Sequence, residues 1–145
     1  GVGEPGRLDQ LPRSWEQARE SLALGSMVGS GHFQAVFFHE LGVLHLLGKI
    51  PTDEVLGSAL FHKLNDALAH GGTPSDVEVL EAYLEEGTLR RAATRVFLHH
   101  TTVEHRLKRI EDKLGLDLSQ PQTRFQAQVL LKLHRMIRLR DASRI

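Results

Sequence analysis

Apolar residues recur with helical spacing along residues 76–114, and two breaks divide this stretch into three short helices. The first helix is predicted over residues 76–85 and ends at Gly87, as a left-handed cap would end it. The second is predicted over residues 89–97 and the third over residues 100–114. The apolar positions at i, i+3, i+4, i+7 and i+8 of the second helix are Leu89, Ala92, Ala93, Val96 and Phe97.

The third helix is apolar on one side only. Val103, Leu107, Ile110 and Leu114 face inward, and the other side is polar and basic. A turn of about three residues precedes the third helix. The second helix, before that turn, contains the small Ala92-Ala93 pair, which allows another helix to approach closely. This order is typical of a DNA-binding helix-turn-helix. The alternative is a generic three-helix bundle that has no DNA-binding role and whose surface is basic by chance.

In a helix-turn-helix the third helix, here about residues 100–114, enters the major groove, so its first turns are expected to read base edges. The second helix lies nearer the backbone and is expected to contact phosphates. The candidate base-reading residues are His100, Thr101, Thr102, Glu104, His105, Lys108 and Arg109, and the candidate phosphate contacts are Arg90, Arg91 and Arg95.

Glu104 has two interpretations. Thr101 and Glu104 have the spacing of a capping box, in which the carboxylate folds back to the backbone and reads nothing. If the helix begins two residues earlier, with His99 as its cap, Glu104 is free to accept a hydrogen bond from cytosine in the groove.

The remaining chain is predicted to contain further helices and one strand. A capping box, Ser14 to Gln17, starts a helix that buries Trp15 and Leu22. Residues 33–38 (FQAVFF) predict a strand, which needs a pairing partner near the N-terminus, in a second chain, or in strands outside this sequence. One helix is expected over about residues 52–68 and a last one over residues 122–140.

The net charge of zero hides an uneven distribution. Residues 1–86 hold 5 basic and 13 acidic side chains, a net charge of −8, whereas residues 87–145 hold 13 basic and 5 acidic, a net charge of +8. Two halves that attract each other would explain this split. Because the basic half coincides with the helix-turn-helix pattern, a polyanionic partner is the better explanation.

Other kinds of site find little support. The chain has no cysteine, no apolar run long enough for a bilayer, and no signal peptide at Gly1, so we expect a cytoplasmic protein. His39-Glu40 with His45 lacks the spacing of a zinc-binding helix, and so do His99, His100 and His105. We expect no metal, no cofactor and no enzymatic activity.

The residues also resemble a known family. Tyr83-Leu84, Ala93, His99 with Thr102, the run from Arg106 to Glu111, Gly115 to Leu118, and Arg124 are similar to the C-terminal helix-turn-helix domain of PucR/CdaR-type bacterial transcription regulators. Residues 14–24 and 36–47 resemble the end of the degenerate GGDEF-like domain that often precedes it.

This resemblance implies a regulator that binds double-stranded DNA as a homodimer, with an effector-sensing region upstream and absent here. His100, Thr101 and Glu104-His105 replace the family's usual Arg, Asn and Arg-Tyr, so the operator does not carry over.

Taken together, the sequence predicts a mainly α chain that is a C-terminal fragment of a longer protein. Residues 1–50 are expected to be a truncated α/β remnant with one or few strands, residues 51–74 a linker helix and loop, and residues 75–145 a Fis-like three-helix core plus a long last helix. The predicted function is sequence-specific DNA binding in transcription regulation. The alternatives are a helical protein-interaction or dimerisation adaptor and a nucleoid-type DNA binder of low specificity.

Overall fold

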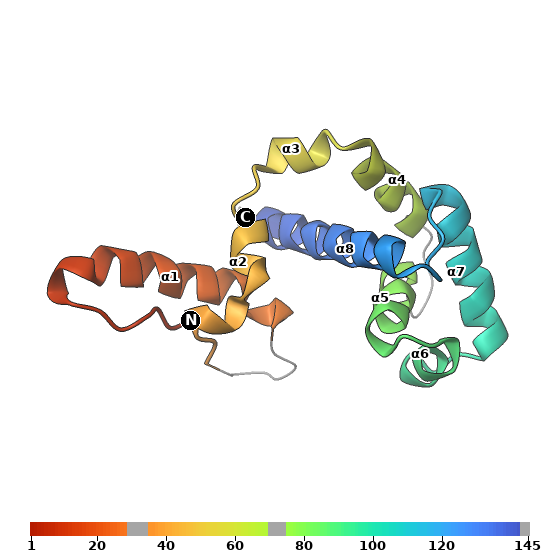
Figure 1. The fold of residues 1–145 in the computed structure, drawn as a ribbon, viewed down its shortest axis with the longest axis horizontal. Coiled ribbons are helices and arrows are strands. Elements are labelled where there is room, and N and C mark those ends of the chain that lie inside the picture. The colour runs from red at the N-terminus through yellow and green to blue at the C-terminus, as the bar shows by residue number, and fades with distance from the viewer. Residues whose placement is uncertain (29–34, 70–74, 143–145) are drawn as a thin grey trace. The chain divides into compact units, whose positions relative to one another are not determined.

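Helices make up nearly all of the regular structure in the computed structural model, which describes residues 1–28, 35–69 and 75–142 (Figure 1). The chain forms two compact units, Gly1–Pro51 with Met136–Ile145, and Thr52–Arg135. The predicted mainly helical fold is confirmed. None of the described helices is both long enough and apolar enough to cross a bilayer.

The first unit is built around α1. Its elements are η1 (Leu8–Gln10), α1 (Leu11–Leu24), η2 (Gly25–Met27), η3 (Phe38–Leu41), α2 (Val43–Leu47) and the last turns of α8 (Pro121–Ala142). Arg140 of α8 donates hydrogen bonds to the carbonyls of Gly48 and Ile50, after α2. These bonds attach the end of the chain to the first unit.

The expected α/β character of residues 1–50 is not found in the described residues. Val2 and Phe37 form a single parallel bridge, in which the Val2 N–H donates to Val36 and the Phe38 N–H donates to Val2, both at 2.8 Å. The chain then turns into η3, because Glu40 accepts the Phe37 N–H at 2.7 Å and closes the turn. Residues 33 and 34 of the predicted strand lie outside the described residues.

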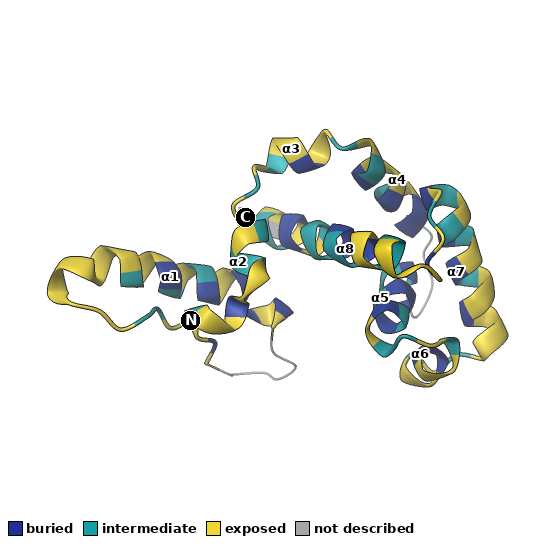
Figure 2. Ribbon diagram, in the orientation of Figure 1, coloured by how far each residue is buried: buried dark blue, intermediate teal, exposed yellow. Residues whose placement is uncertain are grey.

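The predicted start of α1 is wrong, and two of the residues expected on its buried side, Trp15 and Leu22, are exposed. The helix begins at Leu11, with a proline in its first turn. Gln17 does not cap it but accepts the Glu4 N–H at 3.0 Å and is itself buried. The face that carries Gln17 therefore turns inward, and the side chains of Trp15 and Leu22 are left 66% and 74% exposed. Most of α1 is exposed (Figure 2).

The second unit holds the helices that matter for function. They are α3 (Thr52–Leu56), α4 (Ala59–Leu68), α5 (Asp76–Glu86), α6 (Leu89–Arg95), α7 (His100–Leu114) and the first part of α8. The single helix expected over residues 52–68 is divided at Gly57 and Ser58. Ser58 accepts the Phe61 N–H and so starts a new helix.

The α4 helix is part of the core rather than a linker. Phe61, Leu64 and Ala67 are at most 1% exposed, and α7 packs against α4 more extensively than against α5 or α6 (Figure 1). The division into domains at residues 1–50, 51–74 and 75–145 stays a prediction, whereas the compact units are divided after Pro51. The expected domain at residues 75–145 differs from the compact unit, because the unit takes in α3 and α4 and stops at Arg135.

The helix ends in this unit follow from local sequence. Ser75 and Glu78 form a reciprocal capping box at the start of α5, and Thr88 caps α6. Gly87 and Gly115 end α5 and α7 with φ values of +73° and +70°, a conformation that glycine adopts without strain. These caps fix where the turn that precedes α7 can lie.

Candidate nucleic-acid interface

The turn between α6 and α7 is held by small residues and backbone hydrogen bonds. Ala92 and Ala93 are 0% and 5% exposed, so α6 lies close to α5 and α7. The Leu98 N–H donates to the Ala93 carbonyl at 3.0 Å, and Phe97 has a φ of +55°. The α6 helix ends at Arg95, two residues before its predicted end, and the turn that follows directs the chain into α7.

The predicted division of α7 into two faces is observed. Val103, Leu107, Ile110 and Leu114 are at most 4% exposed. Six of the seven candidate base-reading residues are exposed on the other side of the helix: His100, Thr101, Thr102, Glu104, His105 and Lys108. Arg109, the seventh, is only half-exposed.

Arg109 belongs to an anchor at the back of α7. It donates to Asp76 Oδ2 at 2.5 Å, and Arg106 Nε lies 3.1 Å from Asp76 Oδ1. Asp76, the first residue of α5, is fully buried, whereas the side chains of Arg106 and Arg109 are 15% and 40% exposed. Asp76 Oδ1 and Arg109 Nε have no geometrically good hydrogen bond among the described residues, so charge attraction dominates there. Arg109 therefore ties α7 to α5, and its predicted base-reading role finds no support in this geometry.

The start of α7 decides between the two interpretations of Glu104. The helix begins at His100 with His99 as its N-cap, so Thr101 does not cap it. His99 Nδ1 instead lies 2.8 Å from Thr101 Oγ1. Glu104 is exposed and free of the capping box, so its carboxylate is available to a ligand.

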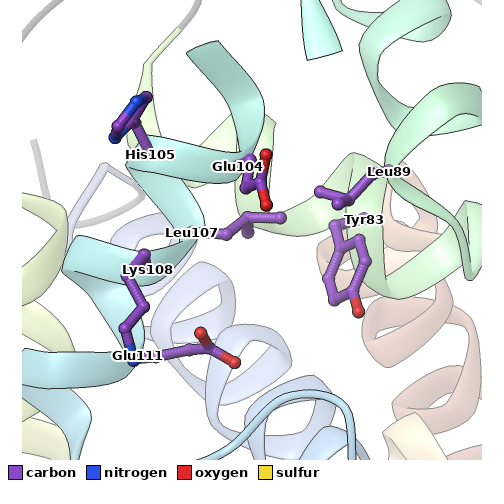
Figure 3. A pocket seen from close by; sticks show the side chains of 7 residues that line it. All are labelled: Tyr83, Leu89, Glu104, His105, Leu107, Lys108 and Glu111. Atoms are coloured by element: carbon purple, nitrogen blue, oxygen red, sulfur yellow. The ribbon is translucent and has the colours of Figure 1, made fainter. Parts of the chain in front are cut away.

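Glu104 and His105 are neighbours on α7 whose side chains point in different directions (Figure 3). An open pocket of about 470 Å³ lies beside the helix, and it is lined by Tyr83, Leu89, Glu104, His105, Leu107, Lys108 and Glu111. Figure 3 shows Glu104 on the side of Leu89 and Tyr83, with His105 pointing away. A carboxylate in this place repels a phosphate, whereas it can accept a hydrogen bond from the amino group of a base.

Lys108 is held in an exposed ion pair with Asp112, 3.2 Å away and one turn further along α7. The hydrogen bond to Asp112 raises the pKa of Lys108, because it favours the charged form of the lysine. Both side chains are about two-thirds exposed, which means that the pair is weak and that Lys108 can exchange this partner for another anion.

The arginines of α6 face acidic residues at the end of α5. Arg91 lies 2.9 Å from Glu86, and Arg95 lies 2.5 Å from Glu85 and 3.7 Å from Glu86. The hydrogen bond to Glu85 raises the pKa of Arg95. Sequence reasoning missed these partners, although Glu85 and Glu86 stand only a few residues before α6. Arg90 is exposed on the same helix.

The histidines before and at the start of α7 lie close together, with the ring centroids of His99 and His100 4.2 Å apart. Across residues 1–28, 35–69 and 75–142, no three histidine or carboxylate side chains converge as metal ligands do. The first three residues of α7, His100, Thr101 and Thr102, present imidazole and hydroxyl groups. Both kinds of group can donate and accept hydrogen bonds.

The helix-turn-helix region matches a known domain family. Residues 77–133 match the PucR C-terminal helix-turn-helix domain. The Purine catabolism regulatory protein of Bacillus subtilis (strain 168) is 26% identical over 134 residues, which cover 90% of this chain and 25% of that protein. Uncharacterized protein Rv2242 of Mycobacterium tuberculosis and Uncharacterized protein Mb2266 of Mycobacterium bovis are each 46% identical over 55 residues.

Those 55 residues are 37% of this chain and 13% of each mycobacterial protein. The chain thus spans a quarter or less of the length of these relatives, and no solved structure matches it. The family match covers nearly all of α5, all of α6 and α7, and much of α8, whereas α4, which also packs against α7, lies outside it. Residues 77–133 are therefore similar in sequence to the PucR C-terminal helix-turn-helix domain, and they include α6, the turn and α7.

Proposed function

We propose that Thr52–Arg135 binds the major groove of double-stranded DNA through α7, as the sequence-specific part of a transcription regulator that acts as a homodimer. The observation that carries this proposal is the exposed polar face of α7, from His100 to Lys108, on a helix whose other face is buried. A rigidly held helix with a free polar face meets the geometric need of groove readout. The family match and the name of the Bacillus relative support it.

The proposed base-reading residues follow from exposure along α7. They are His100, Thr101, Thr102, Glu104, His105 and Lys108. Threonine can contact a thymine methyl group or a base edge, and a glutamate can accept from the amino group of cytosine. Arg109 is left out of this set, because its guanidinium is held by Asp76.

The phosphate contacts are assigned to Arg90, Arg91 and Arg95 of α6. Arg91 and Arg95 have carboxylate partners, but these pairs are substantially exposed on the arginine side and are weak in water. Exchanging Glu85 or Glu86 for a phosphate therefore costs little. Three such contacts in each subunit of a dimer give six phosphates, for which log K should fall with log salt at a slope of about −5.

The decisive measurement is binding of the whole chain to a random-sequence duplex pool across a salt series, followed by fluorescence anisotropy. A steep linear loss of affinity with salt supports the proposal. If the dimeric chain fails to bind duplex DNA at low salt, the adaptor function is favoured instead.

Two substitutions separate sequence readout from general attraction to DNA. Arg91→Ala should weaken binding to all duplexes alike, whereas His105→Ala should change the preference among duplexes enriched from the pool. Arg19→Ala removes the same charge from α1, where the side chain is 66% exposed, and serves as the matched control. Equal effects of Arg91→Ala and His105→Ala on every duplex would indicate a nucleoid-type binder.

The proposed dimer has a geometric requirement. On a palindromic site the two α7 helices must be about 34 Å apart, or a multiple of that distance. The resemblance further leads us to propose that an upstream region of the longer protein senses an effector. That residues 1–50 are the end of a GGDEF-like domain stays a prediction.

A further inference from the structure

Phe97 is in an unfavourable position for the fold. It lies in the turn between α6 and α7, and it is the one residue other than glycine with a positive φ in the described part of the chain, at +55°. A bulky L-residue is strained in this region, because its Cβ approaches the backbone. Its side chain is also 94% exposed, so no apolar burial offsets the strain.

The fold itself does not require a phenylalanine here. The turn is held by backbone hydrogen bonds, from the Phe97 N–H to Thr94 and from the Leu98 N–H to Ala93, which any residue could make. Glycine would adopt the same φ without strain. Strain that the surrounding structure maintains is a recognised sign of a functional position.

The residues around Phe97 indicate a partner whose surface is mostly polar and carries one small apolar group. The exposed residues near it in sequence, Arg95, His99 and His100, are cationic or hydrogen-bonding, whereas the adjacent apolar Val96 and Leu98 are partly buried. Protein interfaces are built on contiguous apolar patches, and an isolated ring in a polar rim does not form one. In the major groove, by contrast, the apolar features are single methyl groups of thymine, set among hydrogen-bonding base edges.

We propose that Phe97 contacts a thymine methyl group at the edge of the major groove, beside the bases that the start of α7 reads. This inference rests on the proposed DNA binding. With α7 in the groove, the turn that immediately precedes His100 lies at the groove edge, and the ring is presented outward from it. Phe97 is thus a specificity residue that favours thymine at one position of each half-site.

The test removes the ring and the methyl group separately. A duplex enriched by the wild-type chain from a random pool is made again with deoxyuridine for thymidine, which deletes only the methyl groups, first at all positions and then one at a time. The wild-type chain should bind the duplex about fourfold more weakly when the contacted methyl group is missing. Phe97→Gly should bind the thymidine duplex more weakly and be insensitive to that methyl group.

Controls separate this contact from folding. Phe97→Gly should melt at the same temperature as the wild-type chain or higher, so weaker binding does not reflect unfolding. Phe97→Leu keeps an apolar side chain and should keep part of the methyl sensitivity. Phe125→Ala removes another exposed phenylalanine, 60% exposed on α8, and should keep all of it.

Equal methyl sensitivity of Phe97→Gly and the wild-type chain would overturn the inference while leaving DNA binding intact. Unchanged DNA affinity of Phe97→Gly with altered self-association in sedimentation would also overturn it, in favour of a protein interface. If the wild-type chain binds no duplex, the proposed function itself fails, and this outcome is seen before any variant is made.

Discussion

Replacing Asp76 by Asn tests the anchor that holds α7. Asn has nearly the shape of Asp but no charge, so the substitution leaves the guanidinium groups of Arg106 and Arg109 facing a neutral amide. The carboxylate is fully buried and lies within 3.1 Å of Arg106 and 2.5 Å of Arg109. We therefore expect a large loss of stability from a single change of charge.

The expected loss of stability follows from the exposure of Asp76, Arg106 and Arg109. Removing one partner of a buried ion pair destabilises a protein by about 3–5 kcal/mol, because the other charge stays buried. Arg109 is 40% exposed and can turn towards water, which reduces its contribution to the loss of stability. Arg106, at 15%, has less access to water. Asp76 also lies in the first turn of α5, where its charge favours the helix dipole. Asp76→Asn should thus cost about 3 kcal/mol, at the lower end of that range.

The assay is urea denaturation of the whole chain followed by circular dichroism, with thermal melting alongside. For a unit of this size, 3 kcal/mol corresponds to a fall in melting temperature of about 15 °C. The matched control is Asp112→Asn, which breaks the exposed pair with Lys108 and should cost less than about 0.5 kcal/mol. Adding Arg106→Met to Asp76→Asn should recover part of the loss, because the more buried of the two guanidinium groups that face the neutral amide is then replaced by an apolar side chain.

Two results would refute this reasoning. If Asp76→Asn costs no more than Asp112→Asn, the pair with Arg106 and Arg109 is not a buried anchor. If Arg106→Met destabilises the Asp76→Asn variant further, its guanidinium is stabilised mainly by groups other than Asp76.

Three further predictions concern helix ends and packing in the second unit. The hydrogen bonds from Ser75 lower the pKa of Glu78 below its ordinary value of 4.5, so Glu78 adds stability above that pH and loses it as the pH falls through the lowered value. Glu78→Gln should accordingly melt below the wild-type chain at pH 7 but not in strong acid, and a difference that persists in acid would exclude this cause. Gly87→Ala should cost about 1 kcal/mol in urea denaturation, since φ is +73° and an added Cβ would meet Arg124 Nη1 at an ordinary contact distance of 4.0 Å; no loss would mean that the turn relaxes. Ala92→Leu should cost about 1–3 kcal/mol by overpacking, whereas the exposed Thr94→Leu should cost little; equal losses would contradict close packing at Ala92.

Local signals made the helix-turn-helix predictable. The capping box of Ser75 and Glu78, together with the glycines at the ends of α5 and α7, specify helix ends through contacts only a few residues apart. For this reason α5 begins at Asp76 and α7 ends at Leu114, as predicted.

Contacts between distant residues were not predictable in the same way. Arg109 looked like a DNA contact from its place on α7, but its partner Asp76 is 33 residues away in sequence, and no local pattern reveals that they meet. Trp15 was expected to be buried because apolar periodicity shows which side of a helix is apolar. It does not show whether anything packs against that side.

The positions of Arg106 and Arg109 have a consequence for how this domain can change its target. On α7 the side chains that hold the helix and those available to DNA are different sets, separated by their place around the helix axis. Under the proposed function, substitutions at Thr101, Glu104 or His105 are expected to change which DNA sequence is bound without altering how α7 is held on α5. The positions at which this chain departs from the family pattern, His100, Thr101, Glu104 and His105, are all among the exposed residues of α7. Other side chains can be introduced at these positions while Arg106 and Arg109 still hold the helix.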